Sequence, residues 1–525
     1  MVAAAGARFW ALSQGLPFVM SRPDEREALE HTVGFASGDL NPHWFVYPNL
    51  FFWAVWLWEE LVLAVRRVWI PTPSYATLLV TDMPRLLLYG RALSALVGTA
   101  TVALLYVVGA KTGGRRLGLL AAALLAGNFL HVRDSHALKS ESFVTLGMLA
   151  GAWLLARWVA APQRRRAVVA GAVIGVATAL KYNGILLLIP AWLADLRWGG
   201  RRGWRRWLPS GQLVLLGATA LGVFTVLSPF LVLDALTMQS TAAFVGKAVY
   251  ASRPGPPAAG GTLARLLGER AFGYHVTVSL RHGFGLTFAL ATPVAILSAL
   301  RRDTPVLLRL AAPFCLVYYL AIGASPVLLA RYLTPLAPLL ALLVAALVVA
   351  LADRAGTRRA RTAVLVAGAI ALLGEPVASI AAWGRIASRT DTRVLATRWM
   401  AEHLAPGSVV AELGTIVFPI SDPDLPPGVV RAPLPLGATE LERWDVRYVV
   451  THEHLLPFSK LIPRQMQTLT PRLRPLAVFS PYRDGPAGGF EVQDAYYIPF
   501  FDFAGVERPG PVVRIYAYQP PTDAP

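Results

Sequence analysis

Long apolar runs separated by clusters of arginine constrain the fold of this chain more than any other feature of its sequence. The hydrocarbon core of a bilayer is about 30 Å thick, and a helix needs about 20 apolar residues to cross it. The runs lie at about 1–20, 84–110, 117–133, 139–157, 167–181, 184–196, 208–232, 283–300, 304–324, 332–352 and 362–384. The sequence therefore predicts a polytopic all-α membrane protein with about eleven transmembrane helices.

Composition agrees with lipid as the main solvent. Of the 525 residues, 55% are hydrophobic and only 15% are charged, too few for the surface of an ordinary soluble protein. The net charge of +18 would suggest nucleic acid if the basic residues formed one patch, but they lie in short clusters between the apolar runs. This pattern argues against nucleic acid as a partner. The single cysteine, Cys315, leaves no disulfide framework.

The basic clusters also predict the orientation of the chain. They lie at 111–116, 157–166, 197–206, 301–302 and 354–361. If the crossings alternate, all five fall on one side of the membrane, and lysine and arginine favour cytoplasmic loops. We therefore expect a multi-pass protein of the cell (inner) membrane, with the other loops and the C-terminus outside the cytoplasm.

Residues 44–68 are hydrophobic enough to span, but a crossing there would place every later basic cluster outside. The segment is rich in tryptophan, which favours the membrane interface. It also holds the adjacent carboxylates Glu59 and Glu60, which are costly in hydrocarbon. We predict a juxtamembrane helix at the outer interface, within a first external loop at 21–83.

A second domain is predicted from residue 385, where proline, glycine and charge increase. Asp391 can cap a helix that ends before Pro406. Short β-rich runs follow at 407–414, 447–454, 475–482 and 511–519. The expected organisation is a transmembrane domain at 1–384 and a soluble extracytoplasmic α/β domain at 385–525.

Two loops concentrate acidic residues. Asp24 and Glu25 follow the first apolar run directly, and a carboxylate at the membrane surface can act as a general base. Polar loops often carry such a pair without function, although the tryptophan-rich segment that follows favours the catalytic interpretation. The second loop, HVRDSHALKSE at 131–141, is either a turn with internal ion pairs or the lining of a cavity. Its candidates are Arg133, Asp134, His136 and Glu141.

A divalent metal cation is a further candidate cofactor. His136 and Glu141 are its weak candidate ligands, since their spacing matches no specific metal motif. Isolated cations on the same side, Arg91, Lys181 and Arg331, would suit a lipid phosphate if they converged. Each cation alone is more often an interfacial anchor.

These motifs resemble the GT-C superfamily of polyprenol-phosphate-sugar-dependent glycosyltransferases, in particular bacterial relatives of protein O-mannosyltransferases and of the lipid A aminoarabinose transferase. The similar stretches are RPDE at 22–25, GDLNPHWFVYPNL at 38–50, HVRDSHALKSE at 131–141, GVATALKYNGILLLIP at 175–190 and RYLTPLAPLLALL at 331–343. Each motif is loose, and their order and spacing carry the resemblance.

The resemblance implies roles for particular residues. The catalytic first-loop carboxylate of the family falls on Asp24, with Glu25 beside it. The second-loop pattern usually ends in aspartate where this chain has Glu141, so the second acidic role, sometimes linked to a metal, stays open between Glu141 and Asp134. Cations that help hold the lipid phosphate match the residues Lys181 with Tyr182 and Arg331 with Tyr332.

The function implied is inverting transfer of a sugar from a polyprenyl-phosphate donor, held with its tail in the membrane lipid, to an extracytoplasmic acceptor. One base and a cationic clamp suffice, because the lipid phosphate is a good leaving group. The alternatives are a transporter or flippase, which inverted repeats would favour, and a non-catalytic envelope assembly protein. The sequence names neither the sugar nor the acceptor, which could be protein, lipid or glycan.

Overall fold

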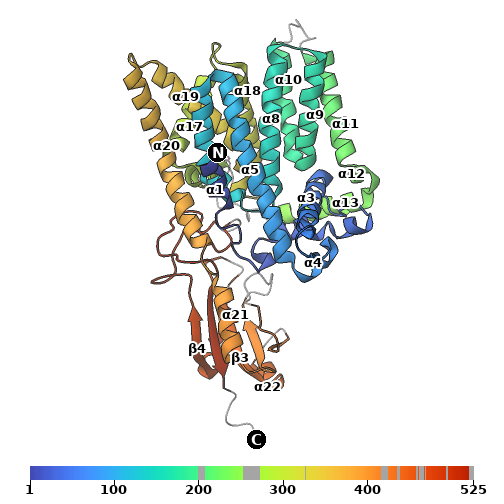
Figure 1. The fold of residues 1–525 in the computed structure, drawn as a ribbon, viewed down its shortest axis with the longest axis vertical. Helices are drawn as coiled ribbons and strands as arrows, with labels where there is room; N and C mark the ends of the chain where they lie inside the picture. The colour runs from blue at the N-terminus through green and yellow to red at the C-terminus, as the bar shows by residue number, and fades with distance from the viewer. Residues whose placement is uncertain are drawn as a thin grey trace, which may run out of the picture. The chain divides into compact units, whose positions relative to one another are not determined.

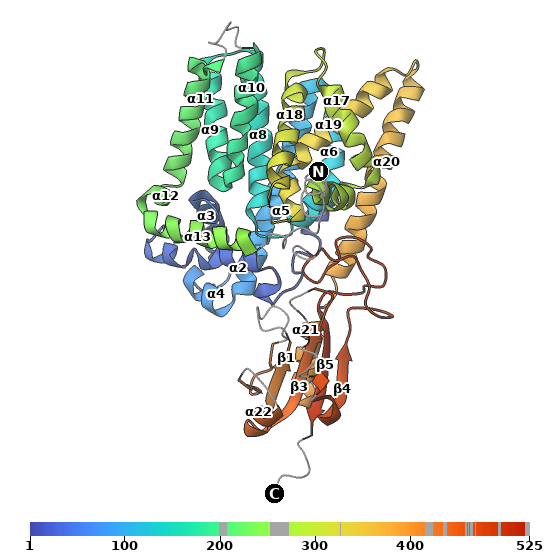
Figure 2. The same ribbon diagram turned by 180° about the vertical axis from the view of Figure 1, so that it is seen from behind.

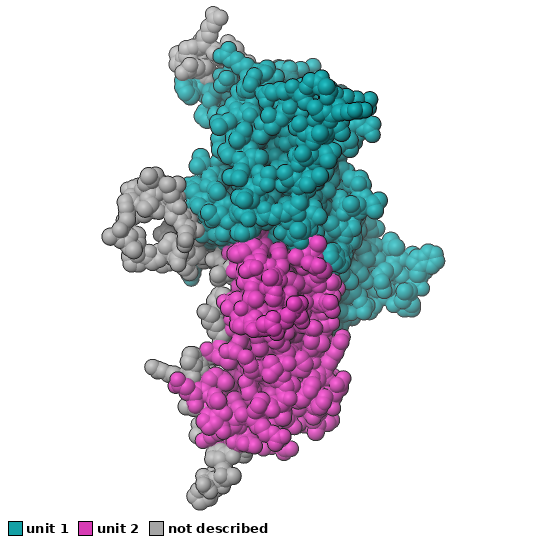
Figure 3. All heavy atoms as spheres, turned by 90° about the vertical axis from the view of Figure 1, so that its left-hand side faces the viewer, with its two compact units in different colours: residues 1–12, 24–380 teal, residues 13–23, 381–525 magenta. Residues whose placement is uncertain are grey.

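The computed structural model describes residues 1–198, 207–251, 272–325, 327–414, 424–433, 438–456, 459, 461, 466–467, 469–491 and 495–519. The chain forms two compact units. Unit 1 consists of Met1–Leu12 and Asp24–Ile380, and unit 2 of Ser13–Pro23 and Ala381–Pro525 (Figure 3). Unit 2 thus includes the early segment 13–23, which the division at residue 384 assigns to the transmembrane domain.

Unit 1 is helical over its described residues. Helices α8 to α11 run side by side, and α13 lies across the direction of this group (Figure 1, Figure 2). The helices are α1 (Val2–Phe9), α2 (Pro23–Glu30), α3 (Asn49–Arg67), α4 (Tyr75–Thr81), α5 (Met83–Gly113), α6 (Arg115–Ala126), α7 (Phe129–Asp134), α8 (Ser140–Ala160), α9 (Arg164–Leu180), α10 (Leu188–Trp198), α11 (Gly211–Leu227), α12 (Phe230–Leu233), α13 (Ala235–Ala251), α15 (Phe272–Tyr274), α16 (Arg281–Phe284), α17 (Leu286–Ala299), α18 (Val306–Gly323), α19 (Ala337–Asp353) and α20 (Arg358–Ala387).

Two short 3-10 helices, η3 (Tyr182–Leu187) and η6 (Ala330–Leu336), precede α10 and α19. Length and composition make five of the described helical segments able to cross a membrane: Met83–Gly113, Ser140–Ala160, Val306–Gly323, Ala330–Asp353 and Arg358–His403. The bent pair Phe272–Phe284 and Leu286–Ala299 would add a sixth. A polytopic helical protein is therefore supported, while the number eleven stays a prediction.

The first apolar run differs from expectation. Only Val2–Phe9 is helical, and a turn follows in which Ala11 has a positive φ of 64°. Eight residues at about 1.5 Å each extend about 12 Å, less than half of the hydrocarbon core. The prediction of a membrane-crossing helix over 1–20 is therefore wrong. Arg8 explains the short helix, because its buried guanidinium bonds the carbonyl of Leu125 and Nδ1 of His131 inside the unit.

Helix α3 forms within the predicted segment 44–68, and it is not among the candidate spans. Its place at the outer interface stays a prediction. Val55, Glu59 and Leu63 lie on its buried face at helical spacing, and α3 packs against α5 and α9. Glu59 is fully buried, and neither of its oxygens has a hydrogen-bond partner among the described residues. Glu60, by contrast, lies near the exposed Arg67. Of these two carboxylates, only Glu59 therefore lowers the stability of the folded state through its burial.

Replacing Glu59 with glutamine is expected to stabilise the protein. Burial raises the pKa of Glu59 to about 9 from 4.5, so the folded state keeps a proton that the unfolded state releases above pH 4.5. Stability that depends on Glu59 is complete below pH 4.5 and is lost as the pH rises toward 9. At pH 7.5 the Glu59→Gln variant should gain roughly 1 to 4 kcal/mol, measured as a higher midpoint of thermal unfolding. Glu60→Gln is the matched control. If Glu59→Gln raised the midpoint of thermal unfolding no more than Glu60→Gln does, or lowered it, the destabilising burial of the Glu59 carboxylate would be contradicted.

Unit 2 is the predicted α/β domain. Its five-stranded sheet has the order β2-β1-β3-β5-β4, in which β1 pairs in parallel with β2 and β3, and β5 pairs antiparallel with β3 and β4. Helix α21 packs Ala396 and Met400 against Val410 and Ile515 of the sheet. The elements are β1 (Val409–Leu413), β2 (Val430–Arg431), β3 (Val446–Glu453), β4 (Leu473–Phe479), β5 (Val512–Tyr518), α21 (Thr392–His403) and α22 (Ala438–Arg443).

The segment 13–23 belongs to unit 2 through one buried arginine. The Arg393 guanidinium donates to both oxygens of Asp391 and to the hydroxyl of Ser21 at 2.8 Å. It also stacks over the rings of Phe18 and Tyr497, at 4.1 and 4.9 Å from their centroids. Asp391 caps α21 as predicted, by accepting from the backbone N–H of Arg393. One fully buried side chain therefore connects the N-terminal segment to the sheet domain.

Candidate active site

Asp24 lies in the first turn of α2 and faces two cations. Its Oδ2 is 2.5 Å from Nη2 of Arg331 and 3.4 Å from Nζ of Lys139. The side chain keeps 28% of its surface exposed. Asp24 therefore pairs with two cations and is still within reach of a bound substrate.

Glu141 lies in the first turn of α8 and is almost completely buried. Its Oε1 is 2.6 Å from Nζ of Lys181 and 3.2 Å from Nε of Arg331. Because Arg331 also contacts Asp24, its guanidinium bridges the two carboxylates. We call Asp24, Lys139, Glu141, Lys181 and Arg331 the charged cluster.

Local structure places the two cations contributed by later segments. Lys181 follows the last residue of α9 in extended backbone, so the chain turns there before η3. Gly184 makes this turn possible, since a Cβ at that position would lie 2.5 Å from the backbone carbon of Ala177. Arg331 lies in η6, directly before the apolar helix α19. The KYNG and RYLTP motifs thus bring their cations to the same end of unit 1.

Aromatic side chains surround Lys181. Its Nζ lies 5.8 Å from the ring centroid of Tyr47 and 5.9 Å from that of Tyr332, within the range of cation-π attraction. The Tyr182 hydroxyl donates to the carbonyl of Phe45 at 2.7 Å. Tyr182 therefore fixes the loop that carries Tyr47 and does not face the charged cluster through its hydroxyl.

The charged cluster has more positive than negative groups. Three cations, Lys139, Lys181 and Arg331, meet two carboxylates, which leaves one positive charge in excess. Such a cluster attracts an anion, and a phosphate can accept bidentate hydrogen bonds from arginine. The exposed carboxylate of Asp24 lies at the edge of this positive region. The arrangement can hold a phosphate and place a base beside it.

Two predicted residues lie elsewhere. Glu25 and Arg91 pair with each other at 2.6 and 2.8 Å, and both are buried. Glu25 also accepts from the backbone N–H of Leu138, and Arg91 donates to the carbonyl of Leu12. Neighbouring residues on a helix point about 100° apart, so Asp24 faces the cluster while Glu25 faces the protein interior. The expected catalytic role of Glu25 and phosphate contact of Arg91 do not fit this geometry.

The second loop contributes less than expected. Its residues Phe129–Asp134 form α7 and are buried. Arg133 lies 3.7 Å from Asp134, which accepts from the hydroxyl of Thr334. His136 approaches the carbonyls of Trp10 and Val132 at 2.7 and 2.8 Å. These three residues tie the loop to neighbouring segments, and of the two acids proposed for the second role only Glu141 lies in the cluster.

The described residues include no evident site for a metal ion. Among the described residues, no three His, Cys, Asp or Glu side chains group in a way that could hold one. The candidate ligands Glu141 and His136 bind different partners, a lysine with an arginine in one case and backbone carbonyls in the other. We therefore derive no chemical step through a metal.

Similarity to solved structures identifies the fold. The crystal structure of ArnT from Cupriavidus metallidurans bound to undecaprenyl phosphate matches with a TM-score of 0.52 and 16% sequence identity, over 98% of this chain and 97% of that chain. The chain therefore shares the fold of ArnT over nearly the whole length of both proteins. At lower TM-scores, 0.45 and 0.41, the chain is also similar to an oligosaccharyltransferase of Archaeoglobus fulgidus and to the arabinofuranosyltransferase AftD from Mycobacteria. The former match has 12% identity over 86% of this chain and 68% of that chain, the latter 16% over 99% and 40%.

Sequence comparison finds a family match over part of the chain. Residues 83–232 match the family described as dolichyl-phosphate-mannose-protein mannosyltransferase. The matched range spans α5 to α12 and includes Lys139, Glu141 and Lys181. No curated protein matches the sequence. The family match over 83–232 and the fold both agree with the resemblance found in the sequence.

The sequence alone does not assign roles to two residues of this site. Lys139 is one of the titratable residues of the second-loop motif, but nothing in the motif marks it as a partner of Asp24. Tyr47 lies in the first-loop stretch GDLNPHWFVYPNL but has no titratable neighbour in sequence that would mark it. Each residue acquires its partner, Asp24 for Lys139 and Lys181 for Tyr47, only when distant segments meet.

Proposed function

We propose that the chain transfers a sugar from a polyprenyl-phosphate donor to an extracytoplasmic acceptor, with inversion and with Asp24 as general base. The observation that carries this proposal is the charged cluster, in which one exposed carboxylate borders a positively charged site. The GT-C relative ArnT, which was solved bound to undecaprenyl phosphate, supports a lipid phosphate as the ligand of such a site.

The reaction requires one proton transfer and one substitution. Asp24 accepts the proton of the acceptor hydroxyl as its oxygen attacks the anomeric carbon of the sugar. The bond between this carbon and the phosphate oxygen breaks, and the polyprenyl phosphate leaves with one more negative charge than it had in the donor. Attack from the face opposite the leaving group inverts the anomeric carbon. The proton on Asp24 then passes to water.

The cations of the cluster act on the leaving group. The phosphate gains charge as its bond to the sugar breaks, so contacts to Arg331 and Lys181 strengthen in the transition state. No general acid is needed, because the phosphate leaves as a stable anion. Bound phosphate would also compete with Asp24 for Arg331 and Lys139, which now contact the carboxylate. Donor binding would thereby weaken these contacts of Asp24 and make it a better proton acceptor.

The distribution of charge supports an outward-facing site. Glu141 begins α8 and Lys181 follows α9, while the basic clusters at 157–166 lie at the other ends of these two helices. If the basic end faces the cytoplasm, the charged cluster faces the extracytoplasmic side. This is the side on which we place the acceptor.

Replacing Arg331 with glutamine is expected to weaken binding of undecaprenyl phosphate by about ten- to a hundredfold, the effect of losing a hydrogen-bonded charge. The measurement is a binding isotherm on the purified full chain. Arg331→Lys keeps the positive charge but loses the paired N–H donors of the guanidinium. Its affinity for undecaprenyl phosphate should lie between those of the wild type and Arg331→Gln. Arg85→Gln is the matched control, because Arg85 forms an exposed pair with Asp82. Unchanged binding by a folded Arg331→Gln protein would exclude the proposed clamp.

A transfer assay separates the proposal from its alternatives. Purified protein with a polyprenyl-phosphate sugar and an envelope extract should release polyprenyl phosphate and label an acceptor. A transporter or flippase would move the lipid between leaflets without labelling, and an assembly protein would do neither. Movement of the donor without any transfer would therefore contradict the proposed enzyme.

A further inference from the structure

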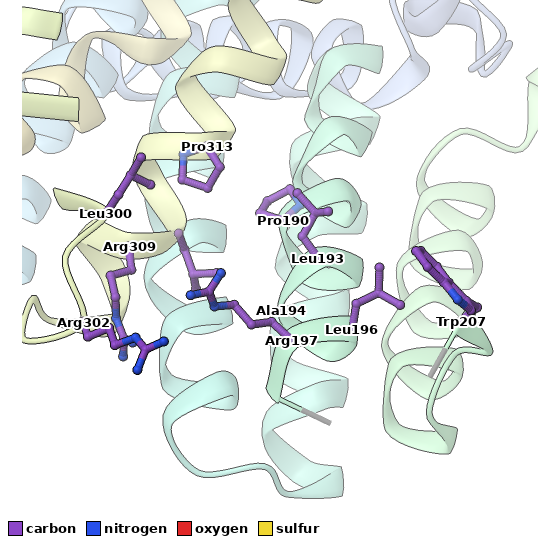
Figure 4. A pocket seen from close by; sticks show the side chains of 11 residues that line it. Pro190, Leu193, Ala194, Leu196, Arg197, Trp207, Leu300, Arg302, Arg309 and Pro313 are labelled. Atoms are coloured by element: carbon purple, nitrogen blue, oxygen red, sulfur yellow. The ribbon is translucent and has the colours of Figure 1, made fainter. Parts of the chain in front are cut away.

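A cavity of about 490 Å³ lies between α10, α18 and the turn that joins α17 to α18. Arg197 reaches from α10 toward α18, which carries Arg309, and Arg302 lies in the turn before α18 (Figure 4). The other described residues that line the cavity are apolar or aromatic, and none is acidic: Pro190, Leu193, Ala194, Leu196, Trp207, Leu300, Leu310 and Pro313. The cavity therefore combines three guanidinium groups with an apolar wall.

This cavity lies at the other end of the helices from the charged cluster. Arg309 is in the first turn of α18, and Tyr318, near the end of the same helix, accepts a hydrogen bond from Asn183 beside Lys181. Nine residues of helix separate Arg309 and Tyr318 by about 14 Å. Arg197 likewise lies in the last turn of α10. The cavity is thus distinct from the proposed catalytic site.

The two kinds of lining select the ligand. A purely apolar ligand would leave the guanidinium groups facing it, and a small inorganic anion would leave the apolar wall in contact with water. A molecule with a phosphate head and hydrocarbon chains satisfies both. Basic pockets between transmembrane helices on the cytoplasmic side suit the heads of anionic lipids. Trp207, at the edge of the cavity and 58% exposed, is a typical interfacial residue.

We propose that this cavity binds one anionic glycerophospholipid of the leaflet at the basic end of unit 1, with its phosphate among Arg197, Arg302 and Arg309 and an acyl chain along Leu193 and Pro313. The site is separate from the donor site and does not depend on the proposed catalytic activity. A lipid held there would contact both α10 and α18. Near the opposite end of α18, Tyr318 accepts a hydrogen bond from Asn183, two residues after Lys181 of the charged cluster.

The test is native mass spectrometry of the full chain in detergent with equal amounts of phosphatidylglycerol and phosphatidylcholine. The wild type should retain phosphatidylglycerol preferentially. The variant Arg197→Gln/Arg302→Gln/Arg309→Gln should bind it about a hundredfold more weakly, at about fivefold for each arginine. Arg354→Gln/Arg358→Gln/Arg359→Gln, exposed residues of another basic cluster, is the matched control and should behave as the wild type.

Two further arms keep the test decisive. Arg302→Gln alone changes an exposed turn residue that folding does not need, and it should still weaken retention about fivefold. Equal retention by the wild type and the folded Arg302→Gln or triple variant would overturn the proposal. Millimolar inorganic phosphate should not displace the lipid, and efficient displacement would show that the site recognises free phosphate instead.

Discussion

Replacing Asp24 with asparagine is expected to reduce sugar transfer by about 10² to 10⁴-fold, the usual contribution of a general base. Asparagine keeps the shape of the side chain but cannot accept the proton of the acceptor hydroxyl. Binding of undecaprenyl phosphate should stay the same or become tighter, because the carboxylate that competes for Arg331 and Lys139 is gone. The measurements are a transfer assay and a binding isotherm on the same preparation.

Two variants control this experiment. Asp82→Asn changes an exposed carboxylate that caps α5, and asparagine caps a helix equally well, so activity should persist. Glu141→Gln tests the second acid of the cluster, which is nearly completely buried and cannot reach an acceptor as Asp24 can. Loss of transfer in Glu141→Gln together with activity in Asp24→Asn would assign the base to Glu141 and refute the mechanism.

Replacing Arg91 with methionine is expected to destabilise the protein by about 3 to 5 kcal/mol, the cost of leaving a buried charge without its partner. Glu25 would lose the guanidinium of Arg91 while still accepting from the backbone N–H of Leu138, and the carbonyl of Leu12 would lose the Arg91 donor. Methionine fills most of the volume, so the effect reports on charge. The midpoint of thermal unfolding in detergent should fall, and the remaining folded protein should bind undecaprenyl phosphate normally.

The double variant Arg91→Met/Glu25→Gln should regain part of this stability, because the buried charge is removed with its partner. Arg85→Met on the same helix is the control, and a change at this exposed site should stay within about 0.5 kcal/mol. If Arg91→Met lost phosphate binding while its unfolding midpoint was unchanged, the sequence-based assignment of Arg91 to the phosphate site would be restored.

Local pattern was a good guide to elements and a poor guide to partners. The runs 84–110 and 139–157 appear as Met83–Gly113 and Ser140–Ala160, since twenty apolar residues in sequence suffice to specify a membrane helix. The run 1–20 does not form a membrane-crossing helix, because Arg8 makes hydrogen bonds to residues more than a hundred positions away. A hydropathy pattern contains no information about such pairings.

The same limit explains the candidate site. Asp24, Glu141, Lys181 and Arg331 could be gathered from their motifs, because each motif lies at an end of an apolar run on the same predicted side. The sequence does not predict which of the adjacent residues Asp24 and Glu25 faces the site. This depends on the rotation of α2 relative to Arg91, a residue sixty-six positions away, and the burial of Glu25 follows from that rotation.

The segment 13–23 makes unit 2 discontinuous along the chain. The chain leaves unit 2 at Pro23 and enters unit 1 at Asp24, so the proposed base directly follows residues held by Arg393 through Ser21 and Phe18. An exchange of unit 2 with that of a relative would therefore have to include both Ser13–Pro23 and Ala381–Pro525. In a chimera that combines residues 381–525 of a relative with residues 13–23 of this chain, the residue at position 393 would lose its matching contacts with Ser21 and Phe18. The segment that directly precedes Asp24 would no longer be held in place.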